Sequence, residues 1–258
     1  MKTEPVKGDK PKASPREKYR NFILEPKRNF VFAYVPKVSC TNWKSILRHL
    51  AGHEDYLNPR LAHDKVKGGL HYLDLKGPER ALLHDPAVPK YAFVRDPYSR
   101  VLSAYLNKIA SRLPLSEEPA EGEEHFIRVA RVIDRFRRRK LDPAAYPEVN
   151  FEVFLLWLRD GLSAFREDEH WQKQTVLLRW PRVKYAWIGH FEKLAEEAPV
   201  LLEKMGATVP FPSQKDVKFA PTNADTKIAA HYTPAAYALV NTLYADDFAN
   251  FGYPMRTA

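Results

Sequence analysis

The fold is decided by two stretches, Asn29-Phe-Val-Phe-Ala-Tyr-Val-Pro-Lys-Val-Ser-Cys-Thr-Asn-Trp43 and Tyr91-Ala-Phe-Val-Arg-Asp-Pro-Tyr-Ser99. In each, a short apolar run typical of a buried strand (29–35 and 91–94) ends at a turn that contains proline. Residues 42–51 and 98–110 then carry apolar side chains at helical spacing. Two successive strand–loop–helix units predict an α/β protein with a parallel sheet.

The rest of the sequence predicts more elements of the same kind. Residues 183–188 form an apolar run typical of a third strand, which Gly189 ends. Helical patterns cover residues 123–140, 151–159, 168–178, 191–204 and 234–248. We expect residues 1–28 to be a flexible basic tail and residues 29–258 to form a single domain.

Charge and cysteine content restrict the class of protein. The net charge is +9, and residues 1–28 hold nine Lys or Arg against four Asp or Glu, a net of +5. Such a tail is usually solvated, and the alternative is peripheral contact with a membrane or another polyanion. The single cysteine excludes an internal disulfide and fits a reducing compartment. Without a run of about 20 apolar residues we expect no transmembrane segment, and we expect no signal peptide.

Polar and basic side chains follow both predicted strands, where parallel sheets bind ligands. Free N–H groups at the start of the helix after Lys37 are suited to an anion. Arg95 and Ser103 offer a planar cation and a hydroxyl to a second phosphate. Alternatively, the small polar residues only cap the helix, and Arg95 only pairs with Asp96. The chain has no G-x-x-x-x-G-K-[ST] motif, so it has no Walker A loop.

Five motifs, in order, resemble those of carbohydrate sulfotransferases that act on chondroitin, dermatan and the HNK-1 glycan, and their bacterial relatives. The segment from Pro36 to Lys44 resembles the family's 5′-phosphosulfate loop, and Phe93 to Lys108 resembles its 3′-phosphate motif. The other three are Glu169-His-Trp171 with Gln174, Tyr185 to Leu194, and Tyr244 to Tyr253. The resemblance spans about residues 30–254. It implies a P-loop-like three-layer α/β fold with a central, mostly parallel sheet flanked by helices.

The resemblance further implies an enzyme that moves a sulfuryl group from 3′-phosphoadenosine 5′-phosphosulfate to an acceptor hydroxyl by in-line displacement, with no metal. We expect the acceptor to be a carbohydrate. Lys37 would stabilise the charge that develops on the leaving phosphate. Arg95 and Ser103 would bind the 3′-phosphate. The 5′-phosphate would contact the backbone of Val38, Ser39, Cys40, Thr41 and Asn42.

Other donor contacts follow from the same resemblance. Trp43 would either stack on the adenine or pack in the core at its helical spacing. Lys218 and Asn223 lie where similar proteins close a loop over the donor. We expect no counterpart of the membrane anchor of the Golgi members, and the sequence has one cysteine where they have more. We therefore expect a cytoplasmic bacterial enzyme.

A general base is needed to accept the acceptor proton, and histidine suits this role near neutral pH. His63, between the two donor motifs, is the first candidate, and His170 is the second. A carboxylate such as Asp168 or Glu169, or no strong base, are the alternatives. His170 and Trp171 would also contact the acceptor, unless they only pack within a helix.

An arginine stripe runs along the predicted helix 123–140, where Arg131 and Arg135 lie on one face. It is either a solvated face or a surface for an anionic polysaccharide. Two other functions remain as alternatives to sulfuryl transfer. One is a nucleotide-binding phosphoryl transferase, and the other is a basic protein that binds RNA or a membrane surface. The modest basic excess outside the tail disfavours RNA, so we expect no nucleic-acid partner.

Overall fold

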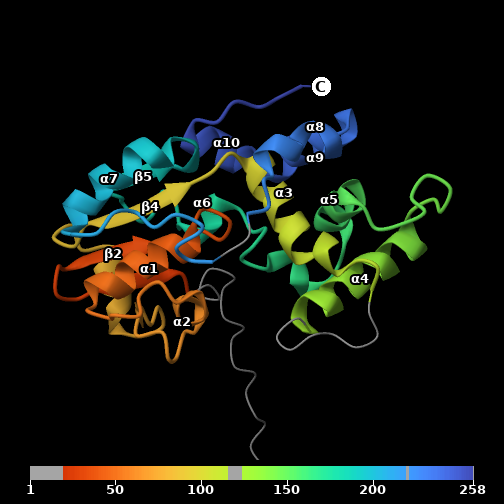
Figure 1. Cartoon of the computed structure of the whole chain (residues 1–258). Helices are drawn as coiled ribbons and strands as arrows, with labels where there is room; N and C mark the ends of the chain where they lie inside the picture. The colour runs from red at the N-terminus through yellow and green to blue at the C-terminus, as the bar shows by residue number, and fades with distance from the viewer. Residues whose placement is uncertain (1–19, 116–123, 219–220, 258) are drawn as a thin grey trace, which may run out of the picture.

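The structure is a computed structural model that describes residues 20–115, 124–218 and 221–257 (Figure 1). A sheet with helices α1, α2 and α7 occupies one half of the molecule, and helices α3, α4, α5, α8 and α9 gather in the other. Each half has its own hydrophobic core. We call these the sheet core, which includes Phe32, Trp43 and Phe93, and the helical core, which includes Phe154 and Trp171.

The sheet has five strands in the order β3-β1-β2-β4-β5. The β2–β4 and β4–β5 pairs are parallel, whereas β1 pairs antiparallel with both β2 and β3. Ala33 is in register with Ala92, so β2 and β4 end at the same edge. The strands are β1 Phe22–Glu25, β2 Phe30–Ala33, β3 His71–Tyr72, β4 Lys90–Val94 and β5 Trp187–His190.

Side-chain caps begin several helices. The Asp96 carboxylate accepts from the Tyr98 N–H at α3, and Asn150 accepts from the Val153 N–H at α5. The α-helices are α1 Cys40–Leu50, α2 Pro59–His63, α3 Pro97–Lys108, α4 Glu124–Lys140, α5 Phe151–Asp160, α6 Gln174–Leu177, α7 Leu194–Met205, α8 Ile228–His231, α9 Pro234–Leu243 and α10 Ala245–Phe251. The 3₁₀ helices are η2 Pro78–Leu83, η3 Ala110–Arg112, η4 Ala164–Glu167, η5 Phe191–Lys193 and η6 Asp225–Lys227.

Helix α1 is held against the sheet by its apolar face. The Trp43 ring lies 5.0 Å from the Phe32 ring of β2 and 4.7 Å from the Phe93 ring of β4, measured between centroids. Burying a large apolar side chain contributes about 1.5–3 kcal/mol. This packing fixes the start of α1, and with it the loop that joins β2 to α1.

The expected α/β class, with a central sheet flanked by helices, is confirmed. The strands predicted at 29–35 and 91–94 are β2 and β4, and the helices predicted at 42–51 and 98–110 are α1 and α3. The sheet is mixed, because β1 and β3 add an antiparallel edge to the parallel strands.

The residue ranges expected for the tail, one strand and two helices are wrong. Residues 22–25 of the expected tail form β1, where Phe22 and Ile23 are buried; residues 1–19 lie outside the described part of the chain. The strand expected at 183–188 is shifted to β5. The helix expected at 168–178 is reduced to α6, and the one at 234–248 is divided at Tyr244 into α9 and α10.

Candidate active site

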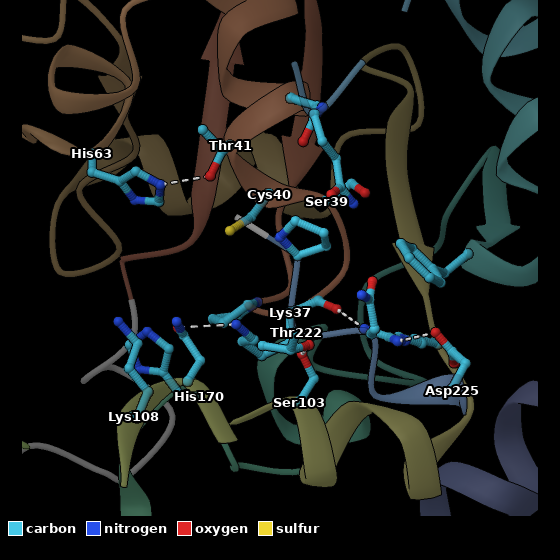
Figure 2. A pocket seen from close by; sticks show the side chains of 18 residues that line it. Lys37, Ser39, Cys40, Thr41, His63, Ser103, Lys108, His170, Thr222 and Asp225 are labelled. Carbon is cyan, nitrogen blue, oxygen red and sulfur yellow. Dashed lines mark hydrogen bonds and ion pairs between the residues drawn. The ribbon is translucent and has the colours of Figure 1, made fainter. Parts of the chain in front are cut away.

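A pocket opens where β2 and β4 end, and it gathers residues from distant parts of the chain (Figure 2). The β2–α1 loop forms one wall, α3 forms another, and residues 221–225 close one end. Ten of the residues predicted for the site line it: Lys37, Ser39, Cys40, Thr41, Asn42, His63, Arg95, Ser103, His170 and Asn223.

The β2–α1 loop turns sharply although it contains no glycine. Lys37 and Ser39 both have left-handed backbone conformations, with φ of 70° and 48°. Such conformations are costly for residues with a Cβ and concentrate at functional sites. Cys40, Thr41 and Asn42 in the first turn of α1 line the pocket, and the first N–H groups of a helix have no intrahelical acceptor. A helix start of this kind attracts an anion.

The Lys37 ammonium lies inside the pocket, where it donates to Oδ1 of Asn107 at 3.0 Å. Burial, with the nearby positive charges of Lys108 and Arg95, lowers the pKa of Lys37 to about 8. The side chain is therefore protonated at neutral pH and loses its charge as the pH rises through 8. Among the described residues Asn107 is its one hydrogen-bond partner, so this cation is available to an incoming anion.

Arg95 is buried and uses every side of its guanidinium. Nε donates to Oγ of Ser99 at 3.1 Å, and Nη1 donates to the Lys37 carbonyl at 3.0 Å. Nη2 forms an ion pair with Asp225 at 2.6 Å. The guanidinium also lies 4.2 Å from the centroid of the Phe191 ring. The structure does not pair Arg95 with Asp96, the alternative considered above. Asp96 pairs with Arg256 instead.

Ser103 lies within α3, and its side chain is only 2 % exposed. Its hydroxyl is 2.8 Å from the Thr222 hydroxyl of the closing segment. Asn223 follows in the same segment, with a left-handed φ of 50°. Arg95 and Ser103 therefore both contact residues 222–225, so this segment covers the second anion site.

The two candidate histidines lie on different walls of the pocket, as Figure 2 shows. Nε2 of His63 is 2.8 Å from the Thr41 hydroxyl. Desolvation in the pocket and the positive charges of Lys44 and Lys108 lower the pKa of His63. Nδ1 of His170 is instead 2.7 Å from a carboxylate oxygen of Asp168. Both rings are neutral at neutral pH, but they differ in what orients them.

One buried arginine connects the donor loop to the segment that carries His170. The Arg100 guanidinium, 1 % exposed, donates to the carbonyls of Pro36, Glu169 and Gln172 at 3.1, 3.2 and 2.8 Å. Three carbonyls on one guanidinium fix the spacing between the two segments.

Several predicted site residues lie elsewhere. Trp43 is 1 % exposed in the sheet core, so of the two alternatives the structure has core packing and not stacking on adenine. Trp171 is 2 % exposed in the helical core, where its Nε1 donates to the Phe165 carbonyl, so it does not contact an acceptor in the pocket. The Val38 side chain is buried, and its N–H donates to the Val35 carbonyl at 3.3 Å rather than facing the pocket.

Three further predicted residues lie outside the pocket. Arg131 and Arg135 are exposed on α4, and the arginine stripe therefore stays a prediction about the surface of the molecule. Lys218 is exposed and has a left-handed φ of 48°, just before residues 219–220, which are outside the described part.

The pocket also contains residues that sequence reasoning did not select: Asn107, Lys108, Phe191, Gln214 and Asp225. A helical period separates Ser103 from Asn107 on α3, and this was a usable signal. Phe191 follows β5 directly, as Arg95 follows β4, so the strand-end rule would also have selected it. Asp225 had no local signal, because its role comes from a contact 130 residues away.

Two kinds of site are not found in residues 20–115, 124–218 and 221–257. These residues hold no group of three or more His, Cys, Asp or Glu able to bind a metal ion. None of their helices has the length and apolar character needed to cross a membrane. The expectation of a metal-free reaction stays a prediction.

The family model that matches this chain and two proteins similar to it all point to sulfotransferases. Residues 20–254 match the model of a sulfotransferase family. Human carbohydrate sulfotransferase 14 is 31% identical over 252 residues, covering 96% of this chain and 64% of the relative. Mouse carbohydrate sulfotransferase 11 is 26% identical, covering 91% of this chain and 67% of the relative. No solved structure matches the chain with significance.

These comparisons also bear on the expected source. The chain spans about 64% of the length of the type 14 enzymes from human and mouse. These relatives come from animals, so they give no support to the expected bacterial, cytoplasmic enzyme.

Proposed function

We propose, on the premise that this chain belongs to the sulfotransferase family, that it transfers a sulfuryl group from 3′-phosphoadenosine 5′-phosphosulfate to a carbohydrate hydroxyl. One observation carries the proposal. Two anion sites, at the ends of neighbouring parallel strands, open into the same pocket. A donor with two separated phosphate groups matches this spacing of charge better than a nucleotide with one phosphate group at a single end.

The donor's two ends have distinct partners in this proposal. The N–H groups at the start of α1 bind the 5′-phosphate. The 3′-phosphate binds Arg95 and Ser103, and it replaces the Asp225 carboxylate as the partner of Arg95. Asp225 supports this assignment, because an oxygen anion of the protein already lies where the phosphate oxygens would be.

The transfer is an in-line displacement at sulfur. The acceptor oxygen forms the new S–O bond while the bond to the 5′-phosphate oxygen breaks and its electron pair leaves with the phosphate. Lys37 stabilises that growing charge in a site shielded from water, where a fixed cation has its greatest effect. The names of the relatives support a carbohydrate as acceptor.

Calorimetry with 3′-phosphoadenosine 5′-phosphate tests the donor site, with AMP and ATP as controls. We expect the 3′-phosphorylated nucleotide alone to bind tightly, and Arg95→Ala to weaken it by about 100-fold, near the upper end of what one hydrogen bond to a charged group contributes. Equal affinity for all three nucleotides, or none, would exclude the donor assignment. Turnover with desulfated chondroitin and dermatan then tests the acceptor class.

A further inference from the structure

Asp168 lies between two histidines that are distant in sequence. It ends the short helix η4, and its Oδ1 is 2.7 Å from Nδ1 of His170. The same oxygen accepts from the His170 N–H at 3.0 Å. The second oxygen, Oδ2, is 2.9 Å from Nε2 of His125 in the first turn of α4. Both carboxylate oxygens are thus fixed, and the carboxylate does not rotate freely.

The contact with Asp168 determines which nitrogen of His170 carries the proton. Burial alone would raise the pKa of Asp168, but its hydrogen bonds with His170 and His125 lower it to about 2. The carboxylate is therefore ionised and only accepts hydrogen bonds. Nδ1 of His170 must be the donor, which leaves Nε2 of this pocket-lining residue unprotonated, with a free lone pair. An imidazole in this tautomer is ready to accept a proton.

The surroundings keep the His170 ring neutral. Burial lowers the pKa of His170, and Lys108 adds to this, whereas Asp168 and Glu169 raise it. His63 also faces His170 across the pocket. Of these groups, Asp168 is the one that contacts the ring, so it has the greatest influence on a proton gained at Nε2.

His63 lacks an equivalent support. Its ring contacts the Thr41 hydroxyl, which is neutral and adapts to either tautomer. Burial lowers its pKa, the positive charges of Lys44, Lys108 and Lys37 lower it further, and none of these lysines would stabilise an imidazolium.

We propose that Asp168, held on its far side by His125, is a positioning residue that makes His170 rather than His63 the base of the reaction. This inference rests on the proposed sulfuryl transfer and assigns its proton step. The acceptor O–H proton moves to Nε2 of His170 as the acceptor oxygen forms its bond to sulfur. Asp168 does not take the proton; it stabilises the imidazolium that results, as the carboxylate of a Ser-His-Asp triad does.

The first test measures the histidines directly by nitrogen NMR of the imidazole rings and needs no acceptor. We expect His170 in the wild type to be neutral with its proton on Nδ1. In Asp168→Ala the proton should move toward Nε2, and the pKa of His170 should fall because a favourable negative charge is lost. An unchanged tautomer and pKa in Asp168→Ala would overturn the proposal.

The second test follows turnover of desulfated dermatan and chondroitin. Asp168→Asn should lower kcat by roughly tenfold or more, within the range that general-base catalysis supplies, and shift the acid limb of the pH profile to lower pH. His125→Gln should have the same direction and a smaller effect. Asp160→Asn, an exposed carboxylate on α5, is the matched control and should behave as wild type.

The outcomes separate this inference from the proposed function. The affinity for 3′-phosphoadenosine 5′-phosphate should change by less than about twofold in each variant, because Asp168 lies outside the donor site. If His63→Ala removes the acid limb while Asp168→Asn leaves it in place, His63 is the base and the inference fails. Failure of the wild type to bind the nucleotide would refute the proposed function, whereas the NMR result would still decide the orientation of His170.

Discussion

The loops that follow β2 and β4 both offer a cation to the pocket, but they hold it in opposite ways. Within the part of the chain that the structure describes, the Lys37 ammonium has one hydrogen bond, to Asn107, and its pKa is lowered to about 8. Arg95 is fixed by Ser99, the Lys37 carbonyl and Asp225. The comparison teaches that Lys37 is free to follow a charge that changes during the reaction. Arg95 is fixed and suits a group of fixed shape. To bind that group, Arg95 must give up one of its protein partners.

Removal of the Lys37 charge tests the loop that follows β2, and it has the largest expected effect. Lys37→Ala should lower kcat by roughly 100- to 1000-fold, the range found when a group that stabilises transition-state charge is removed. The affinity for 3′-phosphoadenosine 5′-phosphate should fall far less. Lys67→Ala, an exposed lysine outside the pocket, is the control. Equal losses in kcat and nucleotide affinity would mean that Lys37 only binds the ground state.

The pH dependence tests the same cation without removing it. Burial favours the neutral form of Lys37, so its charge is present below pH 8 and is lost as the pH rises through 8. We expect kcat/KM for the donor to fall above pH 8 by roughly tenfold per pH unit. Lys37→Arg should remove this limb, since the pKa of arginine exceeds 12. A limb that persists in Lys37→Arg belongs to another group.

The Ser103 hydroxyl of α3, the second group assigned to the 3′-phosphate, tests the same recognition as Arg95. Ser103→Ala should weaken 3′-phosphoadenosine 5′-phosphate by roughly tenfold, the effect of one hydrogen bond to a charged group. AMP, which lacks the 3′-phosphate, should bind the variant and the wild type equally. Ser111→Ala, in η3 and outside the pocket, serves as the control in calorimetry. A matching loss for AMP would place Ser103 away from the 3′-phosphate.

The replacement of Asp225 by the 3′-phosphate as the partner of Arg95 gives the smallest expected effect on nucleotide affinity. Asp225→Asn weakens the ion pair that competes with the 3′-phosphate, so nucleotide affinity should rise by about three- to tenfold. Asp216→Asn changes an exposed carboxylate that accepts from the Ser213 N–H and lies outside the pocket, and it should have no effect on nucleotide affinity. A lower affinity in Asp225→Asn would show that this carboxylate helps to bind the donor instead of competing with it.

The sequence predicted those parts of the fold whose signals are local. The strands β2 and β4 are apolar runs ended by proline, and their register alone brings Lys37 and Arg95 to one edge. Strand β1 was missed because a run of four residues after a basic tail has no pattern of its own. It becomes a strand by pairing with β2 and β3.

The site residues, like the strands, were predictable where their signal was local. Motif residues next to the strand ends were placed in the pocket, but Trp43 was not, because helical spacing does not distinguish a buried face from one that meets a ligand. The segment 168–178 has the periodicity of a helix, yet it forms turns up to residue 173. There the Asp168 carboxylate accepts the His170 N–H, which a continuous helix would direct to its own backbone.

Arg100 has a consequence for the speed of the reaction. By holding the carbonyls of Pro36, Glu169 and Gln172, it sets the spacing between the donor loop and the His170 segment when the chain folds. The reacting groups then lose little further freedom when substrates arrive, which is the condition for a high effective concentration. The barrier should accordingly be dominated by enthalpy, with a small activation entropy for transfer within the bound complex.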